Sequence, residues 1–594
     1  MIAMKTVNIF RISALLALFA AALPGFSQNL DPTVNVSRDF ELRALEAEKP
    51  SLGMEVPDSV TRFNLDFDYS VLSKPYKGAY EFTPYVLEMR PEPDAYRESR
   101  LWLRAGAGYG LHPTLDFVWS PRLQGNFRMS VYASHDSYVG RYRNVGGLLS
   151  SGSRYGAWDS DREADGGRSF FKGYELQTRI GTDGRYDWDG GCVSYDLSYL
   201  GIATRDSVNT RHYDALNVSA RVRSVRDDYS YFFYDAALKL RYGVDRLDYS
   251  CGSALLPQIP AVNETLLDLR TSFGPVIAGE HAVLVDVDGR VATYGRSLSS
   301  HAANLVITPK YCYVNGRFNI KAGIRIDLMK RPDELNELLG TPLNRHKGQI
   351  VYPDVYMNFG IIEGALDLYA RVGGGNDINP YSSMLERNHF FSAAWLGEGL
   401  PLLENSVERV SAMAGLRGRI GSRFSYDLNG GWLFNASAPL DALMARATDV
   451  PGLFPSICFA QYQCAFASLR LGLDTNPFDL DAYLDYKWTD VWKKGLDAIE
   501  PSRLVGGLRA EYNWNRRITV GLDCESSVNR RGHSGGMEVF VPWYLDLGAD
   551  FEYRFSNGLS LWLRAGNLLH QTIQRRPGYS ENGVNCTIGL SFNL

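Results

Sequence analysis

The chain ends with GVNCTIGLSFNL, residues 583–594. Apolar side chains stand at every second position from Val584 to Leu594, and Asn, Thr, Gly or Ser stands between them. Because successive side chains of a β-strand point to opposite faces, this period of two places one face in an apolar medium and the other in a polar one. The stretch therefore predicts the closing strand of an outer-membrane barrel.

Three upstream segments show the same alternation with charges added. They are residues 318–328, 478–488 and 543–555, and each carries charged side chains at several positions between its apolar ones. A sandwich of two soluble sheets does not need such charges beside an aliphatic band that ends in aromatics. A barrel with a lipid-facing band and a wet lumen needs both, so the pattern favours the barrel.

Turn residues divide the chain asymmetrically. Short connections suited to tight hairpins fall at residues 314–316, 360–364, 421–422, 474–477, 515–516 and 556–558. Long connections fall at residues 136–170, 245–263, 331–346, 373–405, 435–455, 490–501, 529–538 and 570–582. From Leu101 we count about 22 strand segments, an even number, as closure with both termini on one side requires. The prediction is an all-β, transmembrane antiparallel β-barrel over residues 99–594.

The beginning of the chain differs from the rest. Residues 1–27 are typical of a secretory signal peptide, with predicted cleavage between Ser27 and Gln28. Residues 28–98 are acidic and show little alternation, so we expect a periplasmic or lumen-filling segment without its own core. No later stretch of about twenty residues is continuously apolar, which excludes a helical membrane protein. We expect the barrel to lie in a bacterial outer membrane, in contact with its lipid.

The composition agrees with strands that face two media. The 594 residues include 35 Tyr, 28 Phe, 11 Trp and 57 Gly. A net charge of −5 with dispersed basic residues argues against a nucleic-acid partner. The seven Cys form no CxxC pair and the nine His form no HExxH motif, so neither a disulfide framework nor a metal site is predicted. We expect no cofactor.

The C-terminal region resembles that of TonB-dependent receptors. The resemblance is carried by Asn567-Leu568, by Arg576-Pro577-Gly578-Tyr579 and by the final strand to Leu594. It implies a 22-stranded barrel over roughly residues 100–594, of the kind expected in a Bacteroidetes outer membrane. Receptors of this family also carry an N-terminal plug longer than residues 28–98 and a short energy-coupling box, and we find neither. The resemblance therefore implies a receptor-type barrel without its own plug.

The lumen face is where a channel would carry its function. The alternation predicts inward side chains at Lys321, Arg325, Asp327, Arg371, Asp479, Asp481, Asp485, Asp546, Asp550, Glu552 and Arg564. Their mixed signs do not define a filter for cations or anions. Two interpretations stay open, which are hydration and salt bridging of the wall, and a selective binding site.

Two further motifs have competing interpretations. Residues 161–166 match part of a calcium-loop pattern, but Lys172 stands where a bidentate carboxylate belongs, so a solvated loop is favoured. Gly106, Gly108 and Gly110 precede no helix, and we expect them on an inward strand face that admits a neighbouring segment.

Two motifs bear on whether a loop closes over a ligand and whether the chain is an enzyme. Residues 373–375, all Gly, and the following Asn379-Pro380-Tyr381 either flex over a ligand or simply leave a strand, and the second interpretation is favoured. Ser134 and His135 lie near a strand end without a recognisable third catalytic group, so we expect no enzyme.

Two functions of different class follow from this fold. In the first, the barrel is a channel or transporter-like protein for solute uptake, and its plug is absent or supplied by a separate chain. In the second, it is a stoppered scaffold subunit of an outer-membrane assembly or export complex, with a partner such as a surface lipoprotein. A wide barrel needs an obstruction, and we expect residues 28–98, an infolded loop such as 136–170, or another polypeptide to supply it.

Overall fold

The structure is a computed structural model, and the part of the chain that it describes begins at Arg100. The described residues are 100–109, 112–143, 170–205, 209–224, 231–249, 261–277, 280–296, 301–330, 350–391, 403, 405–445, 453–475, 477–491, 498–528, 530–534 and 537–594. The predicted signal peptide (1–27), the N-terminal segment (28–98) and the calcium-like pattern (161–166) lie outside them. Among the described residues, no helix is both long and apolar enough to cross a bilayer.

Twenty-four strands and one short helix make up the described part. The strands before the helix are β1 (Leu101–Gly108), β2 (Thr114–Trp119), β3 (Phe127–Arg143), β4 (Phe170–Trp188), β5 (Gly191–Arg205), β6 (Asn209–Ser224), β7 (Phe232–Tyr249), β8 (Ala261–Ile277), β9 (His281–Arg296), β10 (His301–Asn315), β11 (Phe318–Lys330), β12 (Val351–Ile362) and β13 (Leu366–Asp377). Helix α3 (Tyr381–Arg387) follows. The remaining strands are β14 (Ser406–Ile420), β15 (Phe424–Ala445), β16 (Leu453–Asp474), β17 (Phe478–Val491), β18 (Leu504–Trp514), β19 (Ile518–Ser527), β20 (Arg530–Ser534), β21 (Met537–Val541), β22 (Tyr544–Ser556), β23 (Leu559–Gly566) and β24 (Asn585–Asn593).

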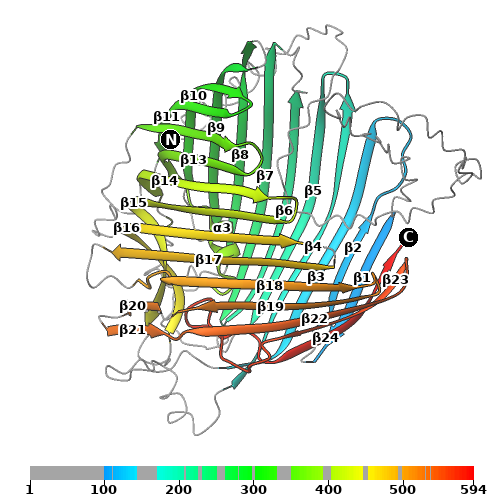
Figure 1. Ribbon diagram of the computed structural model, residues 1–594. Coiled ribbons are helices and arrows are strands. Elements are labelled where there is room, and N and C mark those ends of the chain that lie inside the picture. The colour runs from blue at the N-terminus through cyan, green and yellow to red at the C-terminus, as the bar shows by residue number, and fades with distance from the viewer. Residues whose placement is uncertain are drawn as a thin grey trace, which may run out of the picture. The chain divides into compact units, whose positions relative to one another are not determined.

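Twenty-two of these strands form one closed antiparallel sheet. Each pairs with the next along the chain, β19 pairs with β22, and the separate hairpin β20–β21 lies between those two in sequence. Pairing of β1 with β24 closes the ring, with Ala105 opposite Leu590, and Figure 1 shows these two strands side by side. The predicted fold class and the count of 22 strands are confirmed.

The two faces of the ring differ as the alternation predicted. In β24, Ile588 and Leu590 are each 52% exposed on the outer face, whereas the inward Thr587 is 3% exposed. The inward Gly106 and Gly589 leave room for the Trp562 ring, since a Cβ added at Gly106 would stand 2.5 Å from it. Gly106 therefore admits a side chain from two strands away; Gly110 lies outside the described residues.

The connections are short at one end of the barrel and long at the other. The short-turn end holds Arg100 and Leu594, and its hairpins lie where the sequence predicted them, for example at residues 316–317, 421–423 and 557–558. Three predicted loops begin too early, because β3, β7 and β15 continue to Arg143, Tyr249 and Ala445. With 22 residues each, β15 and β16 exceed the roughly 9–11 residues that cross a bilayer, so they extend beyond it at the long-loop end.

One long connection turns back inside the ring. Between β13 and β14, residues 378–391 contain α3, and Figure 1 shows this helix within the circle of strands. We call residues 378–391 the crossing segment. The sequence predicted a strand exit and a loop here but not the helix, because seven residues are too few to display a helical period.

Candidate functional site

The predicted lumen residues lie on the inward face of the wall but do not form one cluster. On β11, Lys321, Arg325 and Asp327 alternate with outward apolar side chains such as Ile324. Lys321 stands 5.9 Å from the ring centroid of Tyr356, and Arg371 is the cross-strand neighbour of the same tyrosine. These residues therefore line one stretch of wall without enclosing a common ligand.

The acidic residues of β17 and β22 have different partners. Asp485 accepts from Ser468 (2.7 Å) and pairs with Arg470, while Asp479 and Asp481 lie nearer the short-turn end of the same strand. On β22, Asp546 pairs with Arg575 at 2.7 Å.

The other inward positions of this wall lie on β22 and β23. Glu552 accepts from Ser560 at 2.7 Å, and Asp550 is the cross-strand neighbour of Arg564. Asp485–Arg470 is a salt bridge within the wall, whereas Asp546 pairs with Arg575 of the connection between β23 and β24, so both interpretations of the inward charges stay open.

The crossing segment spans the bore between distant parts of the wall. It packs on β5, β6, β8, β9 and β10, and it also reaches β15 and β16. Strand β16 lies ten positions from β6 around the 22-stranded ring, close to the diametrically opposite position. A segment that contacts both strands must cross the lumen.

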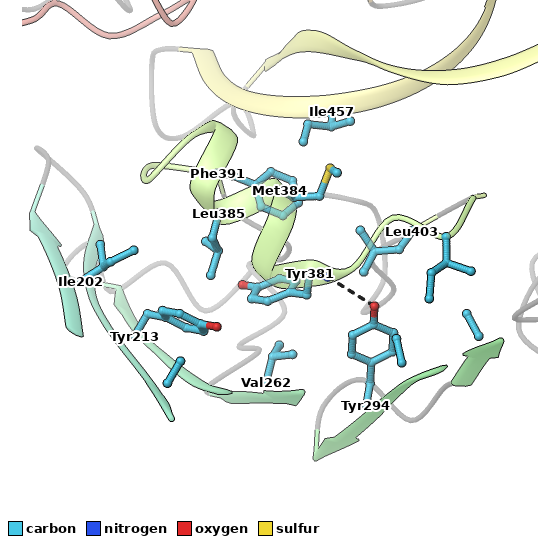
Figure 2. Close-up of a cluster of buried hydrophobic side chains, with 14 of the residues drawn as sticks. Ile202, Tyr213, Val262, Tyr294, Tyr381, Met384, Leu385, Phe391, Leu403 and Ile457 are labelled. Atoms are coloured by element: carbon cyan, nitrogen blue, oxygen red, sulfur yellow. Dashed lines mark hydrogen bonds between the residues drawn. The ribbon is translucent and has the colours of Figure 1, made fainter. Parts of the chain in front are cut away.

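An apolar cluster holds the crossing segment in place. Figure 2 shows Tyr381, Met384, Leu385 and Phe391 of the segment against inward side chains of the wall. The wall contributes Leu200, Ile202, Tyr213, Ala215, Val262, Ala292, Tyr294, Ala302 and Ile457. Lumen walls of wide barrels are usually polar, so this cluster marks the part of the wall that the segment covers.

Buried polar groups bind the start of α3 to β7 and β8. Asp245 accepts from the Tyr381 hydroxyl (2.5 Å), and its ion pair with Arg211 Nε is 3.2 Å long. Glu264 accepts from the Ser382 hydroxyl (2.6 Å) and from the Ser382 backbone N–H (2.8 Å). Glu264 thus accepts from a backbone N–H at the N-terminal end of the helix, where these groups lack partners within the helix, whereas Asp245 holds the side chain of Tyr381.

Further contacts hold the C-terminal part of the crossing segment. Arg211 donates to the carbonyl oxygens of His389 (2.6 Å) and Phe391. On the opposite wall, Arg387 Nη2 lies 3.0 Å from Asp441 Oδ1.

At the root of the crossing segment in β13, the predicted lumen residues Arg325 and Asp327 meet around Asn376. Asp327 accepts from the Asn376 N–H at 2.5 Å, and Arg325 donates to the Asn376 carbonyl at 2.8 Å. These two lumen residues therefore support the crossing segment, and the structure gives them a positioning role.

A second connection also folds over the lumen. Residues 567–582 join β23 to β24, and we call them the strap. Arg575 on the strap pairs with Glu525 (3.1 Å), Asp546 (2.7 Å) and Glu581. Burial raises the pKa of the Glu581 carboxyl, although Arg575 acts in the opposite direction.

The far side of the strap is bound to β3. Ser580 donates to the Arg143 carbonyl at 2.6 Å, and Arg143 donates to Thr572 at 2.8 Å. The strap is therefore anchored at both of its sides. It contains the Arg576-Pro577-Gly578-Tyr579 element on which the family resemblance was based.

In the described part of the chain, the candidate metal ligands and the Ser134–His135 pair are not assembled into a site. Within the described ranges, no group of three or more His, Cys, Asp or Glu is placed to hold a metal ion. His135 contacts Thr178 (2.8 Å) and Ser137 (3.1 Å), and Ser134 points to the other face of β3 because the two residues are adjacent in a strand.

Comparison with known proteins gives structural matches only. No protein-family model matches the sequence, and no curated protein matches it. The FrpB iron transporter from Neisseria meningitidis matches with a TM-score of 0.59 and 9% identity, over 83% of this chain and 81% of that chain. A mutant of the ferric enterobactin receptor PfeA from Pseudomonas aeruginosa matches with a TM-score of 0.55 and 10% identity, over 83% and 80%.

The copper transporter OprC matches with a TM-score of 0.56 and 12% identity, over 84% of this chain and 80% of that chain. All three are transporters or receptors rather than enzymes. Identities of 9–12% establish the fold alone. The described part of the chain therefore shares the 22-stranded barrel fold of these transporters and receptors.

Proposed function

We propose that this barrel takes up a solute across the outer membrane, through a bore whose long-loop mouth is narrowed by the crossing segment. The observation that supports the proposal is the solvent exposure of charged pairs on the inward wall. Toward the short-turn end these pairs stay in contact with water, as in Arg185–Asp187 and Arg509–Glu511. A hydrated lower bore below a narrowed mouth is the arrangement of a gated passage.

The crossing segment is an infolded loop, which is one of the three kinds of obstruction expected from the sequence. Residues 144–169, most of the loop proposed for this role, lie outside the described residues, as do residues 28–98. The obstruction that we propose lies in the 373–405 connection, which contains the crossing segment. A solute entering from the long-loop end must pass beside the crossing segment or displace it.

One observation favours the alternative, a stoppered scaffold. The crossing segment is held by an apolar cluster and by buried ion pairs, both of which resist displacement. If these contacts never open, the barrel is closed, and its long loops are left to bind partners. A separate plug or lipoprotein chain would then be a permanent subunit.

Single-channel conductance in a planar bilayer tests the proposal. We would compare the full mature chain with two variants, one lacking residues 28–98 and one in which residues 378–391 are replaced by a Gly-Ser linker of equal length. The proposal expects conductance from the intact chain and a several-fold larger conductance from the linker variant. Silence from all three folded proteins would overturn transport and favour the scaffold.

A further inference from the structure

The crossing segment and the strap meet at one point beneath the long-loop mouth. We propose that they form a single gate, latched by Glu175 together with His389 and Phe390 of the crossing segment and Arg576 and Tyr579 of the strap. These five residues are called the latch. The inference rests on the proposed transport function, because a gate requires a passage, but its contacts can be tested separately.

One carboxylate oxygen joins the two segments. His389 Nδ1 lies 2.5 Å from Glu175 Oε1, and Arg576 donates to the same oxygen at 3.1 Å. Glu175 belongs to β4 near the long-loop end, so a wall residue accepts from both segments at once. Charge-assisted hydrogen bonds of this kind are about twice as strong as neutral ones. Loss of the Glu175 charge would therefore weaken both attachments together.

A direct aromatic contact also joins the two segments, in addition to their shared bonds to Glu175. The rings of Phe390 and Tyr579 are stacked with their centroids 4.2 Å apart and an interplanar angle of 15°. Both side chains are buried. This is a contact between the two segments themselves, next to the residues that bind Glu175.

The strap is the fixed half of the gate. Its backbone and side chains bond to β3 through Ser580, to β20 through Arg530, which donates to the Arg575 carbonyl at 3.0 Å, and to β22 through Gln571. Asn567 closes the strap on itself by donating to the carbonyls of Gln571 (2.8 Å) and Asn582 (3.1 Å). Contacts to three strands and to itself leave little freedom.

The crossing segment is the half that moves. Helix α3 has seven residues, too few to be stable without its tertiary contacts. At the latch it is held through side chains of the wall and the strap, namely Arg211 and Thr204 on its His389 carbonyl, Glu175 on the His389 ring, and Tyr579 on Phe390. When the latch is released, the end of the crossing segment loses its attachments to β4 and to the strap.

Hydrogen exchange on the full mature chain tests the latch. The variants are Glu175→Gln, which keeps the size of the side chain, and Tyr579→Ala, which changes only the strap. Phe359→Ala is the matched control, because it removes another aromatic stack (Phe318–Phe359, 4.7 Å) on the lipid-facing side of the barrel. The readout is exchange of the amides of Asn388 and Phe391, which are hydrogen-bonded within the crossing segment.

We expect Glu175→Gln and Tyr579→Ala each to speed exchange of these amides by about tenfold, and Phe359→Ala to leave it unchanged. The double variant should exceed the larger single effect only slightly, since the two changes remove different contacts but release the same end of the crossing segment. Exchange in the crossing segment that is unchanged in both latch variants would overturn the gate.

Conductance of the same variants separates the two proposals. Longer open times in both latch variants support gate and transport together. Faster exchange in a barrel that never conducts, even with the linker in place of residues 378–391, supports the latch as a structural contact and overturns both transport and gating. Conductance with unchanged exchange overturns the latch and leaves transport standing.

Discussion

Ion pairs are buried at the long-loop end of the lumen and exposed to solvent at its short-turn end. At the long-loop end, the side chains of Arg211 and Asp245 are 3% and 0% exposed; at the short-turn end, those of Arg185 and Asp187 are 58% and 32% exposed. Both pairs stand on the inward wall of the same sheet. The difference arises because the crossing segment covers the first pair and no described segment covers the second.

Buried and exposed ion pairs contribute differently to the stability of the interior. An exposed ion pair contributes about 0–1 kcal/mol, whereas removal of one partner of a buried pair costs about 3–5 kcal/mol because the other charge is left unpaired. Identical chemistry therefore has a small effect at one end and a large one at the other.

The largest effect is expected from Asp245→Asn. The change leaves Arg211 buried without a counter-charge and weakens the bond from Tyr381, so opening of the crossing segment should become easier by about 3–5 kcal/mol. Hydrogen exchange of residues 382–391 measures this free energy. Asp187→Asn at the wet end is the control, with an expected loss below about 1 kcal/mol. Equal losses would remove the distinction between the two ends.

Leu385→Ala tests the apolar side of the same contrast. Leu385 is fully buried in the cluster of Figure 2, and its truncation should cost about 2–5 kcal/mol of local stability. Leu590→Ala on the outer face should cost less, since lipid chains can fill the space that the side chain leaves. Urea unfolding in detergent, followed together with exchange, distinguishes the two sites. A larger loss at Leu590 would mean that the cluster does not hold the segment.

Two neighbouring serines give a finer test. Ser382→Ala removes a bond to the buried Glu264 carboxylate and should cost about 1.5–3 kcal/mol, because bonds to charged groups are the stronger class. Ser383→Ala removes only a bond to the Pro380 carbonyl (2.7 Å) and should cost about 0.5–1.5 kcal/mol. The order of the two exchange effects is the measurement, and a reversed order would contradict the role of Glu264.

The smallest effect is expected from Arg509→Gln at the wet end. Its nearest approach to Glu511 is 3.9 Å, and the side chain of Arg509 is 63% exposed, so the free energy of unfolding should change by less than about 1 kcal/mol. Raising the salt concentration to about 1 M, where the screening length is about 3 Å, should erase even this difference. A loss that persists in high salt would show that this part of the lumen is filled.

The barrel could be predicted from the sequence because strand alternation and turn residues are set by positions close together along the chain. The period of two in residues 478–488 sets Asp485 inward and Leu484 outward regardless of what lies across the lumen, and the turns at 316–317 and 557–558 follow from their own residues. Strand ends were less accurate. Strands β3, β7 and β15 continue past the predicted loop starts because each pairs with a neighbouring strand of similar length.

For the lumen residues, alternation predicts the direction of a side chain but not its partner. Inward direction was predictable for Arg325 and Asp327, but their binding to Asn376 was not, because it depends on β13 continuing into the crossing segment. Glu264 and Asp245 were missed altogether. In sequence they are single carboxylates at the edge of a long connection, and only their lack of exposure marks them.

The sequence alone determined the strands, the side of each strand that faces lipid and the end that carries the short turns, since all of these rest on neighbours along the chain. The tertiary structure decided which connection folds inward and what it meets. Glu175 and Arg576 are 401 positions apart, and Phe390 meets Tyr579 only after 22 strands have closed. A contact of that kind leaves no period and no spacing in the sequence, because it is made by the geometry of the closed barrel.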